Sequence, residues 1–302
     1  MRRSLMLTWM FAVAGVVPLA AGCASSAAPA AAAAPAAGER RVPTPAGDLV
    51  VREAGRGRTP LVLWHALYAD PSMFAPLIER LGPDYRMLVV AAPGHGPSGL
   101  PAGPLTSADS GAAVLAILDA YGIDRAAVVG CSWGGIAGIQ AAAQAPQRIT
   151  AVAAFNTPFG PGSDDIGTQA IVWMTGWMGD TEFFGRRVAA GFFSPQTHKD
   201  KPQLVDKFVA VFPTRDQDKL QVAARAVLIE RDSLLPLLPK VQAPVLVVAG
   251  ADDARYPAVE AEAAAKQMSR GKFVRVENSA HLTPLEHPEL SARVIRELVL
   301  PQ

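Results

Sequence analysis

The sequence predicts an α/β fold, in which helices cover both faces of a mostly parallel sheet. Short apolar, β-branched runs alternate with stretches of helical periodicity over most of the 302 residues. Such continuous apolar strands are typical of parallel sheets that are buried on both faces. Between about residues 156 and 240 the alternation stops and the sequence is helical in character throughout. We therefore expect a core formed by residues 45–155 and 241–302, into which a helical cap at 156–240 is inserted.

Each expected element has a local signal in the sequence. Met87–Val90 is a continuous apolar run and predicts a buried strand. Residues 106–121 carry apolar side chains at helical spacing, and Gly122 then ends the helix. In this way we predict strands over 48–52, 60–64, 86–91, 126–129, 149–155, 245–249 and 273–276, and core helices over 71–81, 106–121, 136–145, 258–268 and 288–298.

The expected cap is rich in aromatic residues, whereas the core segments are not. Most large apolar residues of a folded domain belong to its core, so most of these aromatics should simply pack together. A minority should line a pocket over the sheet, and for that position we favour Trp173, Trp177 and Phe184. An apolar cap of this kind predicts an apolar small-molecule substrate.

The N-terminal segment predicts export rather than folding. Basic Arg2 and Arg3 precede an almost wholly apolar run over 5–21, which ends in small residues. This is the pattern of a signal peptide, here residues 1–22. Ala-Ala-Gly directly before Cys23 resembles the lipobox of bacterial lipoproteins, which implies a lipid on Cys23 and a membrane-anchored protein of the cell envelope. Simple secretion with cleavage at small residues is the alternative. The Ala/Pro-rich residues 23–44 predict a tether.

Charge and cysteine content exclude several other classes of protein. The formal net charge is +1 and no block of Lys and Arg occurs, so nucleic acid is not an expected partner. The chain has two cysteines, Cys23 and Cys131, and a lipidated or removed Cys23 leaves Cys131 without a disulfide partner. No pair of histidines has metal-ligand spacing around a carboxylate, so we predict neither a metal nor another cofactor.

A Gly-x-Ser-x-Gly pattern is the most informative motif of the chain. The run Gly130-Cys131-Ser132-Trp133-Gly134-Gly135 follows an expected strand and precedes an alanine-rich helical stretch. Strand, motif and helix in this order are typical of a nucleophile elbow, a sharp turn that exposes the serine. The helix that follows directs unpaired N–H groups at the space beside the hydroxyl, where negative charge would develop. Ser132 is therefore the candidate nucleophile.

Candidates for the base and the acid follow later strands. A nucleophilic serine needs a base within hydrogen-bond reach and an acid that orients the base. Asp252 and Asp253 come directly after the strand expected over 245–249, and His281 comes just after the strand over 273–276. The carboxyl ends of parallel strands meet at one edge of a sheet, which is where sites of open α/β folds form.

Five motifs in order resemble the α/β-hydrolase superfamily over about residues 45–300. The branch concerned comprises esterases, C–C bond hydrolases, enol-lactonases and haloperoxidase-like enzymes. The motifs are Leu63-Trp64-His65-Ala66, Pro93-Gly94-His95-Gly96-Pro97-Ser98, the serine motif above, Gly250-Ala251-Asp252-Asp253, and Ala280-His281 followed by Glu286-His287-Pro288-Glu289. Ala66 and Ala92 depart from the family pattern, which has glycine and often aspartate at these positions.

The resemblance implies a Ser132–His281–Asp253 triad, with the cap inserted before the strand that bears the acid. Family spacing favours Asp253 over Asp252, which is then a turn carboxylate. The oxyanion donors would be the backbone N–H groups of Leu67 and Trp133. The implied function is hydrolysis of an ester, thioester or lactone of a small to medium apolar molecule through an acyl-enzyme. C–C bond hydrolysis or haloperoxidase-like chemistry with the same triad, and a non-catalytic ligand-binding lipoprotein, are the alternatives.

Overall fold

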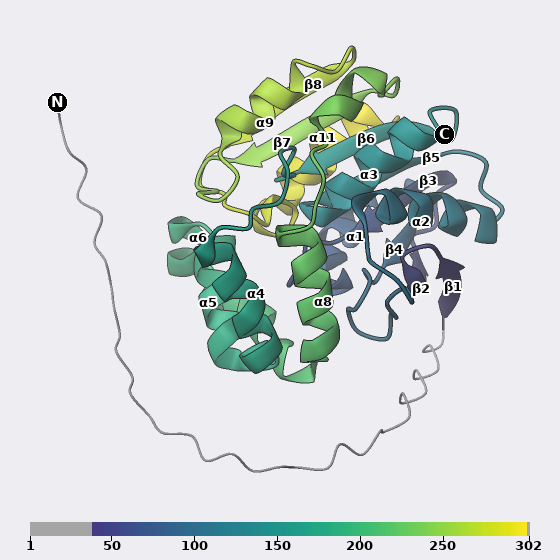
Figure 1. Cartoon of the computed structure of the whole chain (residues 1–302). Coiled ribbons are helices and arrows are strands. Elements are labelled where there is room, and N and C mark those ends of the chain that lie inside the picture. Colours follow the sequence, from purple (N-terminus) through teal and green to yellow (C-terminus); the bar gives the residue numbers. More distant parts are fainter. Residues whose placement is uncertain (1–37, 301–302) are drawn as a thin grey trace, which may run out of the picture. The chain divides into compact units, whose positions relative to one another are not determined.

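The computed structural model describes residues 38–300, and its centre is a mixed sheet (Figure 1). In this part of the chain eight strands form one sheet in the order β1-β2-β4-β3-β5-β6-β7-β8. The strands from β4 to β8 in this order pair in parallel, while β1–β2 and β2–β4 are antiparallel. Their bounds are β1 Glu39–Thr44, β2 Gly47–Ala54, β3 Thr59–Trp64, β4 Tyr85–Val90, β5 Ala126–Cys131, β6 Ile149–Phe155, β7 Val245–Gly250 and β8 Gly271–Val276.

Helices connect the parallel strands and cover the sheet. The helix α1 packs on α11, and α2 packs on α3. Every residue of β5 and β7 is buried, as a sheet covered on both faces requires. The predicted α/β class, with its mostly parallel sheet, is thereby confirmed. The bounds are η1 Pro71–Phe74, α1 Ala75–Leu81, α2 Ser107–Ala120, α3 Trp133–Gln144, α9 Ala258–Ala265, α10 Thr283–Glu286 and α11 Pro288–Leu298.

The first strand corrects one predicted boundary. The tether was expected to extend to residue 44, but the chain already joins the sheet at Glu39, where β1 pairs with β2. The strand is polar and only Val42 is buried, because it lies at the edge of the sheet. An edge strand needs little apolar surface, so its sequence lacks the apolar run that marks the central strands. The predicted signal peptide 1–22 and Cys23 lie outside the described residues.

The helical cap is inserted between β6 and β7. Its bounds are α4 Ile166–Met178, α5 Glu182–Phe192, α6 Pro195–Asp200, α7 Pro202–Val209, η2 Phe212–Thr214, α8 Gln217–Leu228 and η3 Leu235–Lys240. The side chains of Asp165, Thr181, Ser194 and Asp216 cap the first turns of α4, α5, α6 and α8, which explains where these helices begin. Figure 1 shows the cap helices grouped beside one edge of the sheet.

Stacked phenylalanines form the interior of the cap. Phe208 contacts Phe192, Phe193 and Phe212, with ring centroids 5.9, 5.3 and 5.4 Å apart. Phe184 adds a further contact to Phe212 at 6.1 Å. The aromatic content of this segment is thus used mainly for packing, as expected. Between residues 38 and 300 no helix is both long and apolar enough to cross a membrane.

Candidate active site

Ser132 lies on a strained turn between β5 and α3. Its φ of 54° and ψ of −110° are unfavourable for a residue with a side chain. The turn is held because the Ser132 N–H donates to Phe155 O of the neighbouring strand at 2.8 Å, and Ser132 O accepts from Gly135 N at 2.9 Å. Strain that the surrounding structure enforces in this way is characteristic of functional sites.

Close approach of the backbone explains the glycines around Ser132. A Cβ on Gly130 would lie 2.0 Å from Gly134 C, and a Cβ on Gly134 would lie 1.9 Å from Trp64 O. Gly135 is equally constrained, since its Cβ would lie 1.8 Å from Thr157 Oγ1. A side chain at any of these three positions would therefore clash with the elbow, which is why the turn requires glycine there.

His281 and Asp253 form a hydrogen-bonded pair in the loops that follow β8 and β7. His281 Nδ1 donates to Asp253 Oδ2 at 2.7 Å, and both side chains are almost fully buried. The second oxygen of Asp253 accepts from the backbone N–H groups of Arg255 and Tyr256. Asp252, the other predicted candidate, is exposed. The structure therefore brings His281 together with Asp253.

The carboxylate of Asp253 is held in its ionised form. Burial raises its pKa, but the neighbouring His281, the N–H of Tyr256 and the Asn156 amide outweigh burial, and the pKa lies below its usual value. An ionised carboxylate fixes the proton of His281 on Nδ1 and leaves Nε2 free to accept one. This is the form that a general base requires.

Ser132 borders the same cavity as His281 and Asp253. Within the described residues Ser132 Oγ forms no hydrogen bond, and a serine–histidine bond is often long in a ligand-free enzyme. Cys131, one residue earlier, points away from this cavity and its Sγ donates to His281 O at 3.3 Å. Burial raises the pKa of the Cys131 thiol well above its usual value, so Cys131 is not an activated nucleophile.

Asn156 is a site residue that the sequence motifs did not single out. It follows β6 directly and has a φ of 48°. Its Nδ2 donates to Asp253 Oδ2 at 3.2 Å and to Ala280 O at 2.8 Å, so it joins the acid to the histidine loop. Its position at the carboxyl end of a central strand was the available signal.

The cap also holds the histidine loop in place. Phe192 O at the end of α5 accepts from the N–H groups of His281 and Leu282 at 3.1 and 3.2 Å. The Phe192 ring lies 4.8 Å from the His281 ring. The position of α5 is therefore coupled directly to the position of the base.

Glu286 makes a second link between the cap and this loop. Its buried carboxylate accepts from Ala280 N at 2.7 Å, Ser279 Oγ at 3.3 Å and Ser194 N of the cap at 2.8 Å. Three donors converge on this carboxylate, and one of them belongs to Ala280, the residue directly before His281. We infer that Glu286 positions the loop that carries the base.

Replacing Glu286 by glutamine should misplace His281. The amide NH₂ would face backbone N–H donors, so at least one buried hydrogen bond is lost at a cost of about 1–3 kcal/mol of unfolding free energy. We expect kcat to fall roughly tenfold with KM nearly unchanged, because the base moves by a fraction of an ångström. Steady-state kinetics and urea unfolding measure both effects. Glu289→Gln is the matched control, because Glu289 belongs to the same motif but is exposed. It should change the free energy of unfolding by less than about 0.5 kcal/mol. If the two variants had equal kcat and KM, the role assigned to Glu286 would be wrong.

The predicted oxyanion donors lie on two segments next to Ser132: Leu67 lines the cavity that Ser132 borders, and Trp133 directly follows Ser132. Leu67 follows β3 and lines the cavity, and Trp133 is the first residue of α3, where helix N–H groups lack partners inside the helix. No hydrogen bond joins the N–H of Leu67 or Trp133 to another described residue. The Trp133 side chain instead packs into the core, and its Nε1 donates to Ser110 Oγ at 3.0 Å.

His65 braces the loop that carries Leu67. Its Nδ1 donates to Ala66 O at 2.8 Å and its Nε2 accepts from Ala92 N at 2.9 Å. Only the neutral ring can make both bonds, because a protonated Nε2 cannot accept from Ala92 N. Burial, only partly offset by the bond to Ala66, lowers the pKa of His65 to about 4. The neighbouring His95 ring, 4.9 Å away, has its pKa lowered by burial as well.

This histidine should make the protein less stable in mild acid. Between about pH 6.5 and pH 4, His65 is protonated in the unfolded chain but neutral in the folded protein. The free energy of unfolding therefore falls as the pH drops through this window. The total loss in the free energy of unfolding is roughly 3 kcal/mol. Urea unfolding at pH 7 and pH 4.5 measures it. His65→Asn keeps an acceptor for Ala92 N and should remove this contribution; an unchanged pH slope in that variant would contradict it.

The cavity beside Ser132 is small and mostly apolar. Its volume is 240 Å³ and its lining combines the candidate triad with residues of α4, α5 and α8. Phe184 lines it, as predicted, and so does Tyr68, whose hydroxyl meets Thr175 Oγ1 of the cap at 2.8 Å. The full lining is Leu67, Tyr68, Ser132, Ile171, Met174, Phe184, Arg187, Val188, Gly191, Phe192, Val227, Leu228, Asp253, Arg255, Tyr256 and His281.

Trp173 and Trp177 do not line this cavity, and that prediction is wrong. They are 61% and 65% exposed, on the side of α4 that faces solvent. Residues 171 and 174 of the same helix face the cavity instead. Aromatic content indicates that a helix packs on something, but the rotation of the helix decides which residues face inward.

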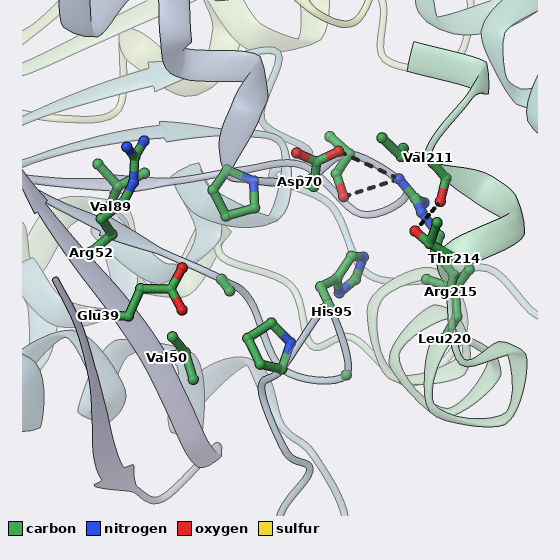
Figure 2. Close-up of a pocket in the computed structure, with 16 residues that line it drawn as sticks. Glu39, Val50, Arg52, Asp70, Val89, His95, Val211, Thr214, Arg215 and Leu220 are labelled. Atoms are coloured by element: carbon green, nitrogen blue, oxygen red, sulfur yellow. Dashed lines mark hydrogen bonds and ion pairs between the residues drawn. The ribbon is translucent and has the colours of Figure 1, made fainter. Parts of the chain in front are cut away.

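A second cavity lies apart from the candidate triad. It has a volume of 320 Å³ and is lined by the start of β1, the loop before η1 and the cap segment around Arg215 (Figure 2). Arg215 donates to Ala69 O at 3.4 Å and lies 4.0 Å from Asp70. The cap thereby also contacts the loop that follows Leu67. Among residues 38–300 no group of three or more His, Cys, Asp or Glu side chains could hold a metal ion.

Comparison with known proteins places this site in a class. The chain belongs to the α/β hydrolase fold family, whose model matches residues 59–288. Within that family it is a hydrolase similar to carboxylic ester hydrolases.

Three relatives illustrate this similarity. The chain is 27% identical over 232 residues to 3-oxoadipate enol-lactonase 2 of Acinetobacter baylyi, covering 77% of this chain and 85% of that protein. It is 29% identical over 259 residues to the pimeloyl-[acyl-carrier protein] methyl ester esterase of Xanthomonas campestris pv. campestris, covering 79% and 94%. The crystal structure of a hydrolase from Pseudomonas aeruginosa PA01 matches with a TM-score of 0.79 and 26% identity, covering 88% of this chain and all of that one.

Proposed function

We propose that the protein is a serine hydrolase that cleaves an ester, thioester or lactone through an acyl-enzyme. The observation that carries the proposal is the convergence of strained Ser132 and the buried Asp253–His281 pair on one apolar cavity. Relatives named as an esterase and an enol-lactonase support this reaction class.

Ser132, His281 and the oxyanion donors each have a specific role in the proposed reaction. His281 Nε2 removes the proton of Ser132, whose Oγ attacks the carbonyl carbon of the substrate. The backbone N–H groups of Leu67 and Trp133 stabilise the negative charge on the carbonyl oxygen. His281 then protonates the leaving alcohol or thiol. Water, activated by His281, attacks the acyl-enzyme in turn and releases the acid.

The cavity supports a small to medium substrate with an apolar acyl part. At 240 Å³ it lies just below the usual range of ligand pockets, which begins at about 300 Å³. Its apolar residues come from the cap and from the loop after β3. A long chain would have to leave beside α5, where the lining residues Arg187 and Gly191 are exposed.

A carboxylate-bearing ester or lactone is a second candidate. Arg187 and Arg255 both line the cavity, and a guanidinium binds a carboxylate well. This observation favours substrates that carry a negative charge away from the cleaved bond. C–C bond hydrolysis and haloperoxidase-like chemistry would use the same residues, and a non-catalytic binding role would need none of the Asp253–His281 pairing.

A panel of p-nitrophenyl esters tests these proposals. Neutral acetyl, butyryl, hexanoyl and decanoyl esters are compared with a succinyl half-ester at equal concentration. Turnover that is highest for a short or medium neutral acyl chain supports the apolar substrate. Faster turnover of the succinyl half-ester supports a carboxylate-bearing substrate, provided that the Arg187→Gln variant loses this preference. Tight binding of an apolar ligand without turnover of any ester would instead favour the binding protein.

We also propose that the protein is exported and lipid-anchored. The basic start, the apolar run 5–21 and the lipobox-like sequence before Cys23 support this. Intact mass spectrometry of the membrane-extracted protein tests it. A chain that begins at Cys23 and carries acyl mass supports the anchor, whereas an unmodified chain in the soluble fraction supports simple secretion.

A further inference from the structure

One face of α4 is apolar although it is exposed to solvent. Ile166 is 89% exposed, Trp173 61% and Trp177 65%, and exposed Ala170 completes the spacing 166, 170, 173, 177 of one helix face. Phe183 at the start of α5 is 65% exposed. We call these five residues the α4 stripe. Helix α4 has no charged residue in its thirteen positions.

This stripe is not explained by packing within the domain. A surface helix normally has polar residues opposite its buried face, and the buried face of α4 already packs on α8. The two indole rings lie 5.4 Å apart, so they form one apolar surface. Exposed apolar patches of this kind mark interaction surfaces, and tryptophan is enriched where a protein meets the interface of a bilayer.

The α4 stripe lies next to the opening of the catalytic cavity. Ile171 and Met174, on the adjacent face of α4, line that cavity together with Arg187 and Gly191 of α5. Arg187 and Gly191 are exposed, as is Arg255 of the loop after β7, so the cavity opens beside α5, where Phe183 of the stripe lies one helical turn before Arg187. A surface that binds the α4 stripe therefore lies close to the entrance of the site.

The described chain begins on the side of the molecule where the cap lies. Glu39, the first residue of β1, lines the same cavity as Thr214 and Arg215 of the cap (Figure 2). The sequence preceding it contains the apolar run 5–21 and Cys23. Residues 24–38 reach at most about 50 Å when fully extended. An N-terminus attached to a membrane would thus keep the cap close to that membrane.

We propose that the α4 stripe docks the cap on the surface of a lipid bilayer. Asp164 and Asp165 precede the helix, and Asp180 and Glu182 follow it. These carboxylates do not favour anionic lipid, so docking is driven by burial of the aromatic and aliphatic side chains in a zwitterionic interface. The consequence for catalysis rests on the proposed hydrolase function: esters dissolved in the bilayer enter the cavity directly from it.

Quenching by brominated lipid tests the contact itself. The full chain is mixed with phosphatidylcholine vesicles with or without bromine on the acyl chains, and Trp173→Phe/Trp177→Phe is measured in parallel. The difference between the two proteins is the emission of Trp173 and Trp177, which we expect brominated lipid to reduce roughly twofold or more. Added phosphatidylglycerol should not strengthen the quenching. Equal emission of the two tryptophans in both kinds of vesicle would overturn the proposal.

A kinetic comparison tests the consequence. Trp173→Ser/Trp177→Ser should lower the hydrolysis of a long-chain ester in phosphatidylcholine vesicles about tenfold, with little change for a soluble short ester or in thermal melting. Val259→Ser, at a 71% exposed valine of α9, should change neither rate. Quenching without hydrolysis of any ester would refute the hydrolase proposal but not the docking. A dimer that the double serine variant converts to a monomer in light scattering would overturn the docking in favour of self-association.

Discussion

Replacing Ser132 by alanine should lower kcat on any ester substrate by about 10⁵- to 10⁶-fold, since removal of a serine nucleophile has effects of this size. The side chain lies at the tip of a strained turn that borders the cavity. The residual rate would come from binding and from the N–H groups beside the cavity. Steady-state kinetics with the best ester of the panel measures this effect, with thermal melting as a test of folding.

Covalent labelling identifies the nucleophile independently of the substrate. A fluorophosphonate should label the wild-type protein and Cys131→Ala, and it should not label Ser132→Ala. Cys131 is the informative control because it is the adjacent residue and the cysteine whose burial disfavours the thiolate. Equal labelling of wild type and Ser132→Ala would show that another residue is the nucleophile.

Asp253→Asn should lower kcat by about 10⁴-fold while the fold is retained. An asparagine at this position can donate from its amide to His281 Nδ1, which then accepts and leaves the proton on Nε2. The ring can no longer take the proton of Ser132. The N–H groups of Arg255 and Tyr256 still donate to the side-chain oxygen, so the fold should be retained, although the Asn156 amide loses its acceptor at this position.

Asp252→Asn is the matched control for this variant. Asp252 is the neighbouring carboxylate, and it is exposed and does not line the cavity. Its replacement should leave kcat within about twofold of wild type, as is usual for surface substitutions. If Asp252→Asn causes the larger loss, the acid has been assigned to the wrong residue.

Local patterns predicted the elements that the core needs. The strands 149–155 and 245–249 and the helix 288–298 were predicted to within one residue of their bounds, because continuous apolar runs and helical spacing are local signals. The edge strand β1 was missed, since an edge strand can be polar. The elbow was predicted for the same local reason: strand, glycines and helix are adjacent in the sequence.

The residues that hold the candidate triad in place could not be predicted from local patterns. Asn156 and Glu286 act through contacts between segments far apart in the chain, such as Glu286 with Ser194 of the cap. Trp173 and Trp177 were placed in the pocket by composition, yet the helix presents them to solvent. A spacing pattern shows that two faces exist, but it does not show which face meets the core.

The sequence alone therefore predicted the fold class, the elbow and the candidates Ser132, Asp253 and His281, because each element or motif that carries them is a short run of residues adjacent in the chain. Only the tertiary structure decided how the acid and the base are held, which cap residues line the cavity, and that the α4 stripe is exposed. Those properties depend on the relative rotation and packing of separate elements. Such packing is fixed by many weak contacts acting together, and no single stretch of sequence contains them.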